Sequence, residues 1–388
     1  MKIARSVLYV NFSPYENAGN ILDFLKKNFS TVILFSFQFH KLHDSKHTDV
    51  CVVYQKGAEI ERINLFRPPI ATSLTFFLLP VRSCIIISQI FIQTLRLRSR
   101  YGPYDIFFTV NAFTSWTGNL LKKLGIVKKT LFWVWDYYPP IHTDIVASVM
   151  RRIYWQFDKV ASSTSTKTVF LNKRLVTLRK EMGIVPPKAV YEIIPIGTNP
   201  IKLSKKKRDK TLRLAFFGVV KKSQGLQLFF SSVETLLTMY PDIELHVIGG
   251  GPDKKYFEDL SKKYPIKAKF YGYVTDEVYM KKIIGACDIG LAPYVPEKSN
   301  VSYYSDPSKI KAYISLGVPV ITTNVFTFSH EIEKAKAGII VSYFKPAEFI
   351  AGVRTIMKHL TSYQNAAYTL SKKYRYNTLY KQLFAGLD

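Results

Sequence analysis

The segment with the clearest chemical signal runs from residue 306 to residue 320 and reads DPSKIKAYISLGVPV. Pro307 near a helix start, Ser308 in the first turn and Gly317 after the end predict a helix that a strand follows at once. Lys309 then lies at the positive end of the helix dipole, where a cation is disfavoured by roughly 0.3–1 kcal/mol unless an anion is bound. This placement predicts that Lys309 binds a phosphate. The alternative is a surface lysine whose amine simply reaches solvent.

Two turns that contain glycine are further candidates for binding a phosphate. In the first, Gly218 follows a predicted strand, and Lys222, Gln224 and Gly225 precede a predicted helix whose first amides carry partial positive charge. In the second, Gly249 opens a run of three glycines and a proline after another predicted strand. Glycine lets the main chain approach a ligand closely. Neither turn has the spacing of a Walker loop or of a dinucleotide fingerprint, so ordinary tight turns remain an alternative.

Apolar, β-branched runs alternate with helical patterns along most of the chain, which is typical of parallel sheets covered by helices. We predict two sets of strands. The first includes residues 6–12, 31–37, 105–110, 130–135, 168–171 and 191–196. The second includes residues 212–217, 243–248, 269–271, 289–292, 319–322 and 338–341. The fold class is therefore α/β, with two Rossmann-like, doubly wound parallel-sheet domains that face a cleft.

The predicted organisation has four parts. Residues 1–200 form the first domain, residues 201–210 a basic linker, residues 211–360 the second domain, and residues 361–388 a helical tail that packs back across the domains. The apolar run near the amino terminus stops at Asn11, so we predict a first strand there and no export signal.

The composition indicates a globular protein with an anionic partner. The chain has 388 residues, 47% of them hydrophobic, and 55 Lys and Arg against 28 Asp and Glu give a formal net charge of +27. Because unpaired charge is costly to bury, this excess lies on the surface, which suits phosphates, a nucleic acid or an acidic membrane. Three widely spaced cysteines give neither a disulfide framework nor a zinc ribbon, which favours a reducing compartment.

Five motifs occur in the order and spacing of a known family. They are Gly218 with Gln224-Gly225-Leu226, the glycine run at 249–252, Tyr271-Gly272-Tyr273-Val274, the run ACDIGLAP at 286–293, and the segment 307–320. Together they resemble the retaining glycosyltransferases of family four, which have the GT-B fold, and the similarity is strongest from residue 212 to residue 341. The resemblance implies that the second domain holds a nucleotide sugar and the first domain holds the acceptor.

The resemblance also implies roles for single residues. The base of the nucleotide would lie near Tyr273 and Val274, with Lys222 and Lys309 reaching the diphosphate. Further candidates for nucleotide binding are Gly218, Gln224, Gly249, Tyr304 and Ser308. Gly19, in the turn after the first predicted strand, is similar to glycines that approach the donor phosphates, although a plain helix start explains it almost as well.

Glycosyl transfer requires the departing diphosphate to be stabilised while the sugar becomes oxocarbenium-like, and preorganised cations and helix amides can do this. No Asp-x-Asp occurs in a suitable turn. We therefore expect no catalytic metal and no cofactor besides the nucleotide-sugar co-substrate.

The sequence departs from the family at four positions. Val219 and Gln224 stand where much of the family has Arg and Lys, and the usual pair of glutamates falls at Tyr304 and Ala312. A branch that acts in bacterial surface-polysaccharide assembly looks similar and also lacks the second glutamate. A divergent active enzyme is therefore preferred to an inactive one.

The first domain offers weaker candidates for the acceptor side. Asp136 ends the run TLFWVWD, at the carboxyl end of a predicted buried strand, and could orient or deprotonate the acceptor hydroxyl. An aspartate in this position also often only caps a turn. His142 is a second candidate. The three histidines between residues 40 and 47 do not have the spacing of a zinc site, and we expect a solvated loop there.

The apolar stretch 70–95, with Arg82 as its only charge and Pro80 near its middle, is long enough to span a membrane. A charge inside the bilayer is costly, and Arg96, Arg98 and Arg100 at the end of the stretch suit lipid headgroups. We predict a pair of interfacial helices within residues 70–100, with buried core helices an equal alternative.

The leading hypothesis is a hexosyl-type transferase that extends a lipid-linked or surface glycan, peripheral on the cytoplasmic face of the cell membrane. A second hypothesis is a catalytically inert partner subunit that binds a nucleotide sugar, because Tyr304 and Ala312 replace the two acids. A third is a nucleic-acid-binding protein, which the net charge would favour. No recognition motif or aromatic platform for single strands is visible, so we expect no nucleic-acid partner.

Overall fold

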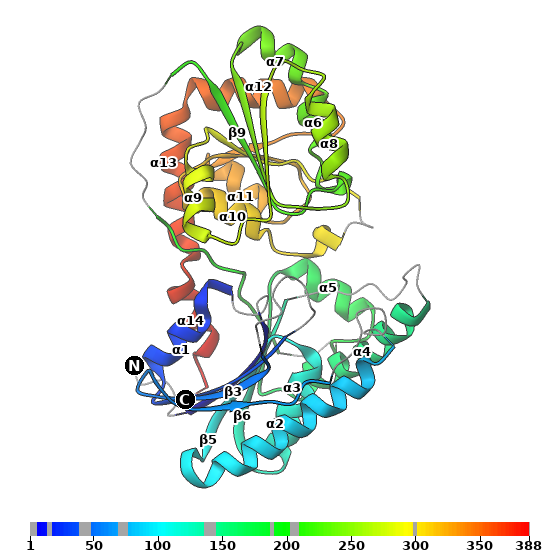
Figure 1. Ribbon diagram of the computed structural model, residues 1–388, viewed down its shortest axis with the longest axis vertical. Coiled ribbons are helices and arrows are strands. Elements are labelled where there is room, and N and C mark those ends of the chain that lie inside the picture. Colours follow the sequence, from blue (N-terminus) through cyan, green and yellow to red (C-terminus); the bar gives the residue numbers. More distant parts are fainter. Residues whose placement is uncertain are drawn as a thin grey trace. The chain divides into compact units, whose positions relative to one another are not determined.

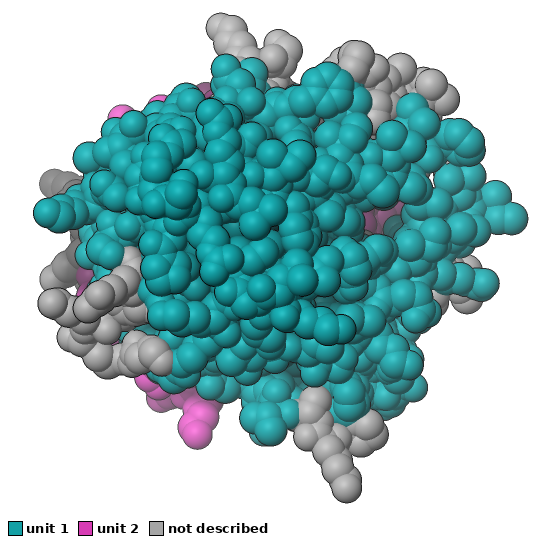
Figure 2. Space-filling model, turned by 90° about the horizontal axis from the view of Figure 1, so that it is seen from below, with its two compact units in different colours: residues 1–195, 377–388 teal, residues 196–376 magenta. Residues whose placement is uncertain are grey.

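The chain folds into two compact units in the computed structural model (Figure 1). The structure describes residues 6–13, 18–38, 48–68, 77–135, 145–186, 190–201, 209–297 and 301–387. Unit 1 consists of residues Met1–Pro195 and Asn377–Asp388, and unit 2 of residues Ile196–Tyr376. Figure 2 colours the two units separately. The end of the chain thus returns to the first unit.

Unit 1 contains an eight-stranded sheet in the order β4-β3-β2-β1-β5-β6-β7-β8. The strands are β1 Ser6–Ser13, β2 Thr31–Gln38, β3 Val50–Gln55, β4 Ala58–Asn64, β5 Tyr104–Thr109, β6 Val127–Val134, β7 Lys167–Phe170 and β8 Glu192–Ile193. The six predicted strands of this unit are all present, and from β2 to β8 neighbouring strands are parallel. The doubly wound fold class is confirmed for this unit.

The antiparallel edge of this sheet, β3 and β4, was not predicted. Both strands pair antiparallel to their neighbours, so the sheet is mixed. Lys56 and Gly57 join them in a two-residue turn, and both have positive φ, 47° and 87°. Such turns match the twist of a hairpin and are usually marked by Asn-Gly or Asp-Gly. Lysine at the first position weakened that signal, and the exposed strand β4 lacks a continuous apolar run.

The helices of unit 1 cover both faces of its sheet. They are α1 Ile21–Asn28, α2 Leu79–Tyr101, α3 Ala112–Lys123, α4 Ile145–Thr164, α5 Lys173–Glu181 and α14 Tyr376–Phe384, with the 3-10 turn η1 Ala18–Asn20 before α1. Helices α2, α3 and α4 lie on one face, and α1 and α14 on the other (Figure 1). On the second face the ring of Phe384 packs against those of Phe24 and Phe108. The terminal helix therefore completes the core of unit 1.

Helix α2 corresponds to the second part of the predicted pair of interfacial helices, and residues 69–76 of the first part lie outside the described residues. Pro80 lies in its first turn, where a proline needs no partner for its missing N–H, and the helix then continues unbroken to Tyr101. Arg82 is buried and donates a hydrogen bond to the backbone carbonyl of Gln38, so this charge serves the fold of unit 1. Among the helices that the structure describes, none is long and apolar enough to cross a membrane.

Unit 2 contains a six-stranded sheet in the order β11-β10-β9-β12-β13-β14. Its strands are β9 Leu212–Phe217, β10 Ile243–Ile248, β11 Lys267–Gly272, β12 Ile289–Ala292, β13 Val320–Thr322 and β14 Gly338–Ile340, and all pairs are parallel. All six were predicted, three of them with the observed bounds. The order of the strands reverses between β9 and β12, which is where open α/β sheets bind ligands beyond the carboxyl ends of the strands.

Helices cover this sheet on both faces. They are α6 Gln227–Phe230, α7 Val233–Met239, α8 Lys254–Ser261, α9 Glu277–Gly285, α10 Ser308–Ser315, α11 Ser329–Lys334, α12 Pro346–Lys358 and α13 Leu360–Ser371, with 3-10 turns η3 Lys222–Gln224, η4 Val301–Tyr304 and η5 Lys372–Tyr374. Leu214 and Phe216 belong to one apolar cluster, while Ala215 between them belongs to the other. This alternation shows that both faces of the central strand β9 are buried.

Candidate functional site

The predicted phosphate-binding turns of unit 2 lie at the carboxyl ends of β9 and β10. The N–H of Gly218 donates to the carbonyl of Ile248 at 2.8 Å, and the N–H of Gly249 donates to the carbonyl of Gly272 at 2.8 Å. Gly249 has a φ of 132°, and a Cβ atom at this position would lie 2.0 Å from the carbonyl oxygen of Gly218. The backbones of the two turns are therefore in direct contact, and only glycine fits at residue 249.

Lys309 lies in the first turn of α10, and its side chain extends into this group of turns. The residue is only 6% exposed. Its Nζ atom donates to Oε1 of Gln224 at 3.1 Å and lies 4.2 Å from the ring centroid of Phe216 and 4.8 Å from that of Tyr294. A Cβ atom at Gly218 would lie 3.0 Å from the Cε atom of Lys309. Two predicted site residues, Gln224 and Lys309, are thus brought into contact from positions 85 residues apart.

The charge of Lys309 is not balanced by a carboxylate in the part of the chain that the structure describes. Its contacts are one amide oxygen and two aromatic faces, which stabilise an ammonium group less than an ion pair would. Burial lowers the pKa of Lys309 to about 7. A bound anion would restore the charged form, because an opposite charge close by raises the pKa of an amine. Anion binding at this site is therefore accompanied by uptake of a proton on Lys309.

The turn that carries Gln224 is tightly packed. Gln224 ends η3, and Gly225 after it has a φ of 80°. A Cβ atom on Gly225 would lie 1.7 Å from the carbonyl oxygen of Pro293, which follows β12. No other residue type fits here without a shift of the backbone. This packing joins the ends of β9 and β12 and fixes the amide of Gln224 beside Lys309.

Lys222, the other predicted phosphate ligand, lies in the same turn but is exposed. Its backbone N–H donates to Asp253 at 2.7 Å, and its Nζ atom lies 4.6 Å from the ring centroid of Tyr256 in α8. The side chain therefore lies along an aromatic ring at the surface of unit 2. Screening by solvent makes such a charge a weaker anchor for an anion than a buried one.

The other predicted residues of unit 2 lie around the same edge of the sheet. Tyr273 and Val274 follow β11, and Tyr273 is exposed, as expected for a ring that could stack on a base. Tyr304 ends η4, with its ring against that of Tyr303. Ser308 is the exposed first residue of α10. The edge therefore collects candidate side chains from three further segments.

Three candidates belong to unit 1. Gly19 lies in η1 with a φ of 60°, which suits glycine and marks a strand-to-helix turn. Asp136 and His142 lie outside the described residues, as do the three histidines between 40 and 47. Within the described ranges, no group of three or more His, Cys, Asp or Glu is arranged to hold a metal ion.

Sequence reasoning missed a buried ion pair at the start of α10. Nζ of Lys311 lies 2.5 Å from Oδ2 of Asp306 and also donates to the carbonyl of Ile196 at 2.6 Å. The same carboxylate oxygen accepts the N–H of Ile196 at 2.6 Å. The pair thus fastens the first residue of unit 2 to the helix that carries Lys309. Only its spacing of five residues was visible in the sequence, and that spacing does not put two side chains on one helical face.

Tyr313 was also missed. It is fully buried in α10, donates from its hydroxyl to the carbonyl of Ala215 at 3.0 Å and accepts the N–H of Phe217 at 2.7 Å. Its ring fills the space above Gly290, where a Cβ atom would lie 2.5 Å away. The hydrogen bonds tie α10 to β9 and so help to set the position of Lys309. The glycine in the motif ACDIGLAP therefore serves this packing.

A known protein family matches part of unit 2. Residues 211–359 match the protein family described as "Glycosyl transferases group 1". No protein with a curated description matches the sequence. The matched residues include both glycine turns, Lys222, Gln224 and Lys309.

Solved structures resemble the whole chain. Sucrose-phosphate synthase from Thermosynechococcus elongatus is 14% identical with a TM-score of 0.68, over 98% of this chain and 100% of that one. HepE from Anabaena in complex with UDP and glucose is 14% identical with a TM-score of 0.64, over 98% of each chain. A UDP-forming α,α-trehalose-phosphate synthase from Burkholderia xenovorans is 13% identical with a TM-score of 0.62, over 99% of each chain. The resemblance inferred from five sequence motifs is thereby confirmed: residues 211–359 match the group 1 glycosyltransferases, and the whole chain has the GT-B fold of these solved structures.

Proposed function

We propose that the protein transfers a sugar from a nucleotide-sugar donor to an acceptor hydroxyl, with retention, and that the donor diphosphate binds between Lys309 and the turns at Gly218 and Gly249. The observation that carries this proposal is the buried ammonium of Lys309, which has no carboxylate partner among the described residues and lies at the reversal point of the sheet in unit 2. A diphosphate supplies the missing negative charge. The N–H groups at the start of α10 add partial positive charge on the same side.

The chemistry follows from this placement. As the bond between sugar and phosphate breaks, negative charge grows on the diphosphate and the sugar becomes oxocarbenium-like. A protonated Lys309 held by Gln224 and two aromatic rings meets that charge without reorganising, which lowers the barrier. In the free site the pKa of Lys309 is about 7. The negative charge of a bound donor raises this pKa, so donor binding favours the protonated lysine.

The contact that Gln224 makes with Lys309 is compatible with an active enzyme, although Gln224 departs from the family pattern. Its Oε1 atom accepts the hydrogen bond from Lys309 at 3.1 Å. A lysine at this position, as in much of the family, would place a second cation at that contact. The glutamine is therefore compatible with a site that uses one buried ammonium. Tyr304 and Ala312, which replace the two glutamates, favour the alternative of an inert partner subunit that binds a nucleotide sugar.

A thermal-shift screen of UDP-, GDP- and ADP-sugars tests the donor. The UDP that appears in the names of two of the structural neighbours favours a uridine nucleotide. A donor at about 100 times its Kd adds about 2.7 kcal/mol to stability and should raise the Tm by roughly 5–10 °C. Lys309→Met should remove the shift. The absence of a shift with all three donors would contradict the proposal. A shift without transfer in a broad acceptor screen would identify the inert partner subunit.

We propose further that the acceptor is a lipid-linked or surface glycan, as in the polysaccharide-assembly branch, and that unit 1 contacts the cytoplasmic face of the membrane through α2. Val81, Cys84, Ile92 and Leu95 lie on the exposed side of this helix. Arg96, Arg98 and Arg100 follow directly, although Arg100 also pairs with Glu61 at 3.0 Å. An apolar stripe beside a basic end suits the surface of an anionic membrane.

Sedimentation with phosphatidylglycerol vesicles tests this contact. The double variant Ile92→Ser/Leu95→Ser should reduce the bound fraction at least tenfold, because two large apolar side chains would no longer be buried in lipid. The double variant Val190→Ser/Val278→Ser removes two exposed apolar residues elsewhere and should bind like the unchanged protein. Equal binding by both variants would exclude α2 as the membrane contact.

A further inference from the structure

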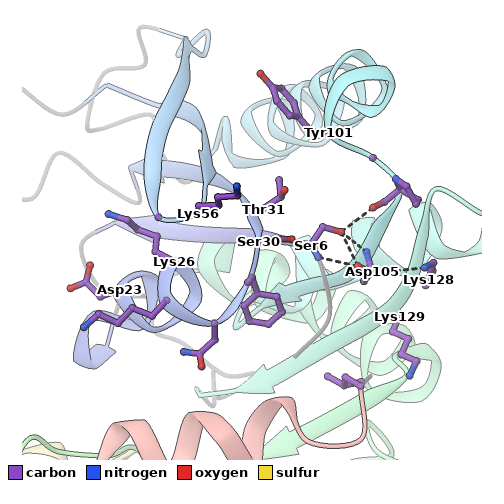
Figure 3. Close-up of a pocket in the computed structure, with 17 residues that line it drawn as sticks. Ser6, Asp23, Lys26, Ser30, Thr31, Lys56, Tyr101, Asp105, Lys128 and Lys129 are labelled. Carbon is purple, nitrogen blue, oxygen red and sulfur yellow. Dashed lines mark hydrogen bonds and ion pairs between the residues drawn. The ribbon is translucent and has the colours of Figure 1, made fainter. Parts of the chain in front are cut away.

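Unit 1 has a large pocket at one edge of its sheet, where the parallel strands begin. Its volume is about 1530 Å³, and it is lined by the first residues of β1, β2, β5 and β6, the carboxyl ends of α1 and α2, and the turn between β3 and β4 (Figure 3). Open α/β sheets bind their substrates at the opposite edge, beyond the carboxyl ends of the strands. The pocket is therefore separate from the acceptor position expected for this unit and from the donor site of unit 2.

The lining of the pocket has an excess of positive charge. It contains five lysines, Lys26, Lys27, Lys56, Lys128 and Lys129, against two carboxylates, Asp23 and Asp105. A concave surface with one sign of charge concentrates ions of the opposite sign. The pocket is thus suited to an anion.

Asp105 offsets only the charge of Lys128, because its two oxygens already have partners. Oδ1 accepts from Lys128 at 2.8 Å, and Oδ2 accepts from the backbone N–H and the hydroxyl of Ser6 at 2.9 and 3.1 Å. Burial by itself would raise the pKa of Asp105, but the hydrogen bonds from Lys128 and Ser6 hold that pKa below its usual value. Asp105 therefore stays ionised and orders the Lys128 side of the pocket.

The lysines on the other side have no acidic partner among the described residues. Lys26 lies 4.8 Å from the ring centroid of Tyr54, and Glu59 near it pairs with Arg62 at 2.7 Å. Lys27 and Lys56 make no ion pair in the part of the chain that the structure describes. Three ammonium groups thus border the pocket without an ion pair among the described residues, and Asp23 is the carboxylate of the lining that comes from the same helix as two of them.

The lysines form two separated groups. In Figure 3, Lys26 and Lys56 lie on one side of the pocket and Lys128 and Lys129 on the other, while Ser30 and Thr31 lie between them. Hydroxyl and ammonium groups are both good donors to phosphate oxygens. Two cationic groups on opposite sides suit a ligand whose negative charges are also separated.

We infer that this pocket binds two or more phosphate groups, either those of one soluble polyphosphorylated compound or those of neighbouring headgroups at the surface of an anionic phospholipid membrane. The proposed donor and acceptor are both expected elsewhere, at the carboxyl ends of the strands, and so do not account for a ligand in this pocket. A ligand bound in this pocket would thus either act on the enzyme as a soluble effector or attach unit 1 to the membrane.

Lysine footprinting tests the site on the full chain. Amine-reactive labelling followed by mass spectrometry is carried out with inorganic tripolyphosphate in one arm and with phosphatidylglycerol vesicles in the other. Labelling of Lys26, Lys27 and Lys56 should slow at least fivefold in one arm or both, while Lys263, Lys334 and Lys336 on unit 2 keep their rates. Protection by tripolyphosphate alone indicates a soluble ligand, and protection by vesicles indicates a headgroup. Protection of none of the three lysines, or equal protection of all exposed lysines, would overturn the inference.

The Lys309→Met variant separates this inference from the proposed donor site. Protection at Lys26, Lys27 and Lys56 should persist in that variant, because it leaves unit 1 unchanged. Loss of protection there would mean that tripolyphosphate acts through the donor site, which would also overturn the inference. If the donor does not bind at Lys309, by contrast, the protection of Lys26, Lys27 and Lys56 should be unaffected.

A triple variant gives a second measurement. Lys26→Gln/Lys27→Gln/Lys56→Asn removes three charges, with asparagine chosen at 56 because the residue there has a φ of 47°. Its matched control is Lys263→Gln/Lys334→Gln/Lys336→Asn, since Lys336 also has positive φ, 53°. Affinity for tripolyphosphate or for vesicles should fall at least tenfold in the first variant only. An equal fall in both would indicate general surface electrostatics and contradict a site.

Discussion

Lys309→Met should reduce the kcat/KM for sugar transfer by a factor of about 100 to 1000. The substitution keeps an unbranched side chain that is one heavy atom shorter and removes the buried ammonium that meets the charge of the departing diphosphate. Loss of one preorganised donor of this kind typically has an effect of that size. The measurement is the initial rate of transfer, or of donor hydrolysis where the acceptor is not available.

The same variant should fold and should be more stable than the unchanged protein. The pKa of Lys309 is about 7 in the folded chain, against an ordinary value of 10.5. Below pH 7 the folded and unfolded states both carry the charge, and the full cost of burying it is present. Between the two values the folded state is neutral while the unfolded state is still charged, so the cost shrinks as the pH rises. The gain in unfolding free energy should be on the order of 2–4 kcal/mol in acidic buffer, and it should fade toward pH 10.5.

Lys221→Met provides the matched control for the rate. Lys221 is an exposed lysine in the same turn, so its loss should change kcat/KM by less than threefold. If Lys309→Met retained more than a tenth of the activity while Lys221→Met was unchanged, the diphosphate would not depend on Lys309. Equal losses in both variants would indicate a general electrostatic effect of the turn.

Lys311→Met should lower the free energy of unfolding of unit 2 by about 3–5 kcal/mol. Lys311 and Asp306 form a buried ion pair at 2.5 Å, and removal of one partner leaves the other charge without compensation. The loss of the contact between Lys311 and the carbonyl of Ile196 adds to the effect. Urea titration monitored by hydrogen exchange of the backbone amides of unit 2 would measure it.

Two further measurements distinguish this explanation from a simple packing defect. The double variant Lys311→Met/Asp306→Asn should recover much of the loss, because the buried charge is gone and the amide can still accept the N–H of Ile196. Burial raises the pKa of Asp306 even in the unchanged protein. Such a carboxylate destabilises the fold above its pKa and is relieved when it becomes protonated. The loss in Lys311→Met should therefore be smaller in mildly acidic than in alkaline buffer, and a loss independent of pH would contradict the ion-pair explanation.

The strands of unit 2 were predictable from the sequence because both faces of its sheet are buried. Residues 212–217, 243–248 and 289–292 are short, mainly apolar runs that each end before a glycine or a proline, and the structure has strands with these bounds. In unit 1 the hairpin of β3 and β4 was missed. Strand β4 is largely exposed, and its turn uses lysine at a position where asparagine or aspartate is the usual signal. Local pattern therefore succeeded where burial was two-sided and failed at the exposed edge.

The apolar stretch from residue 70 to 95 shows why burial cannot be read from hydropathy alone. The same pattern suits a core helix and a membrane contact. In the structure Arg82 is buried against Gln38, while Ile92 and Leu95 are exposed, so one helix has both a buried and an exposed face. The division between its faces depends on the sheet beneath α2, which brings together segments distant in the sequence.

The sequence by itself determined the alternation of strands and helices, the family of the second half and the identity of Lys309 as the residue to examine. These follow from local spacing, since a helix start, a glycine turn or a buried strand involves neighbours along the chain. Only the tertiary structure decided that Lys309 is buried against Gln224, Phe216 and Tyr294, that Lys311 pairs with Asp306, and that five lysines border one pocket. Those contacts join residues from separate elements, and the desolvation that sets their charge exists only after the sheets and helices have packed.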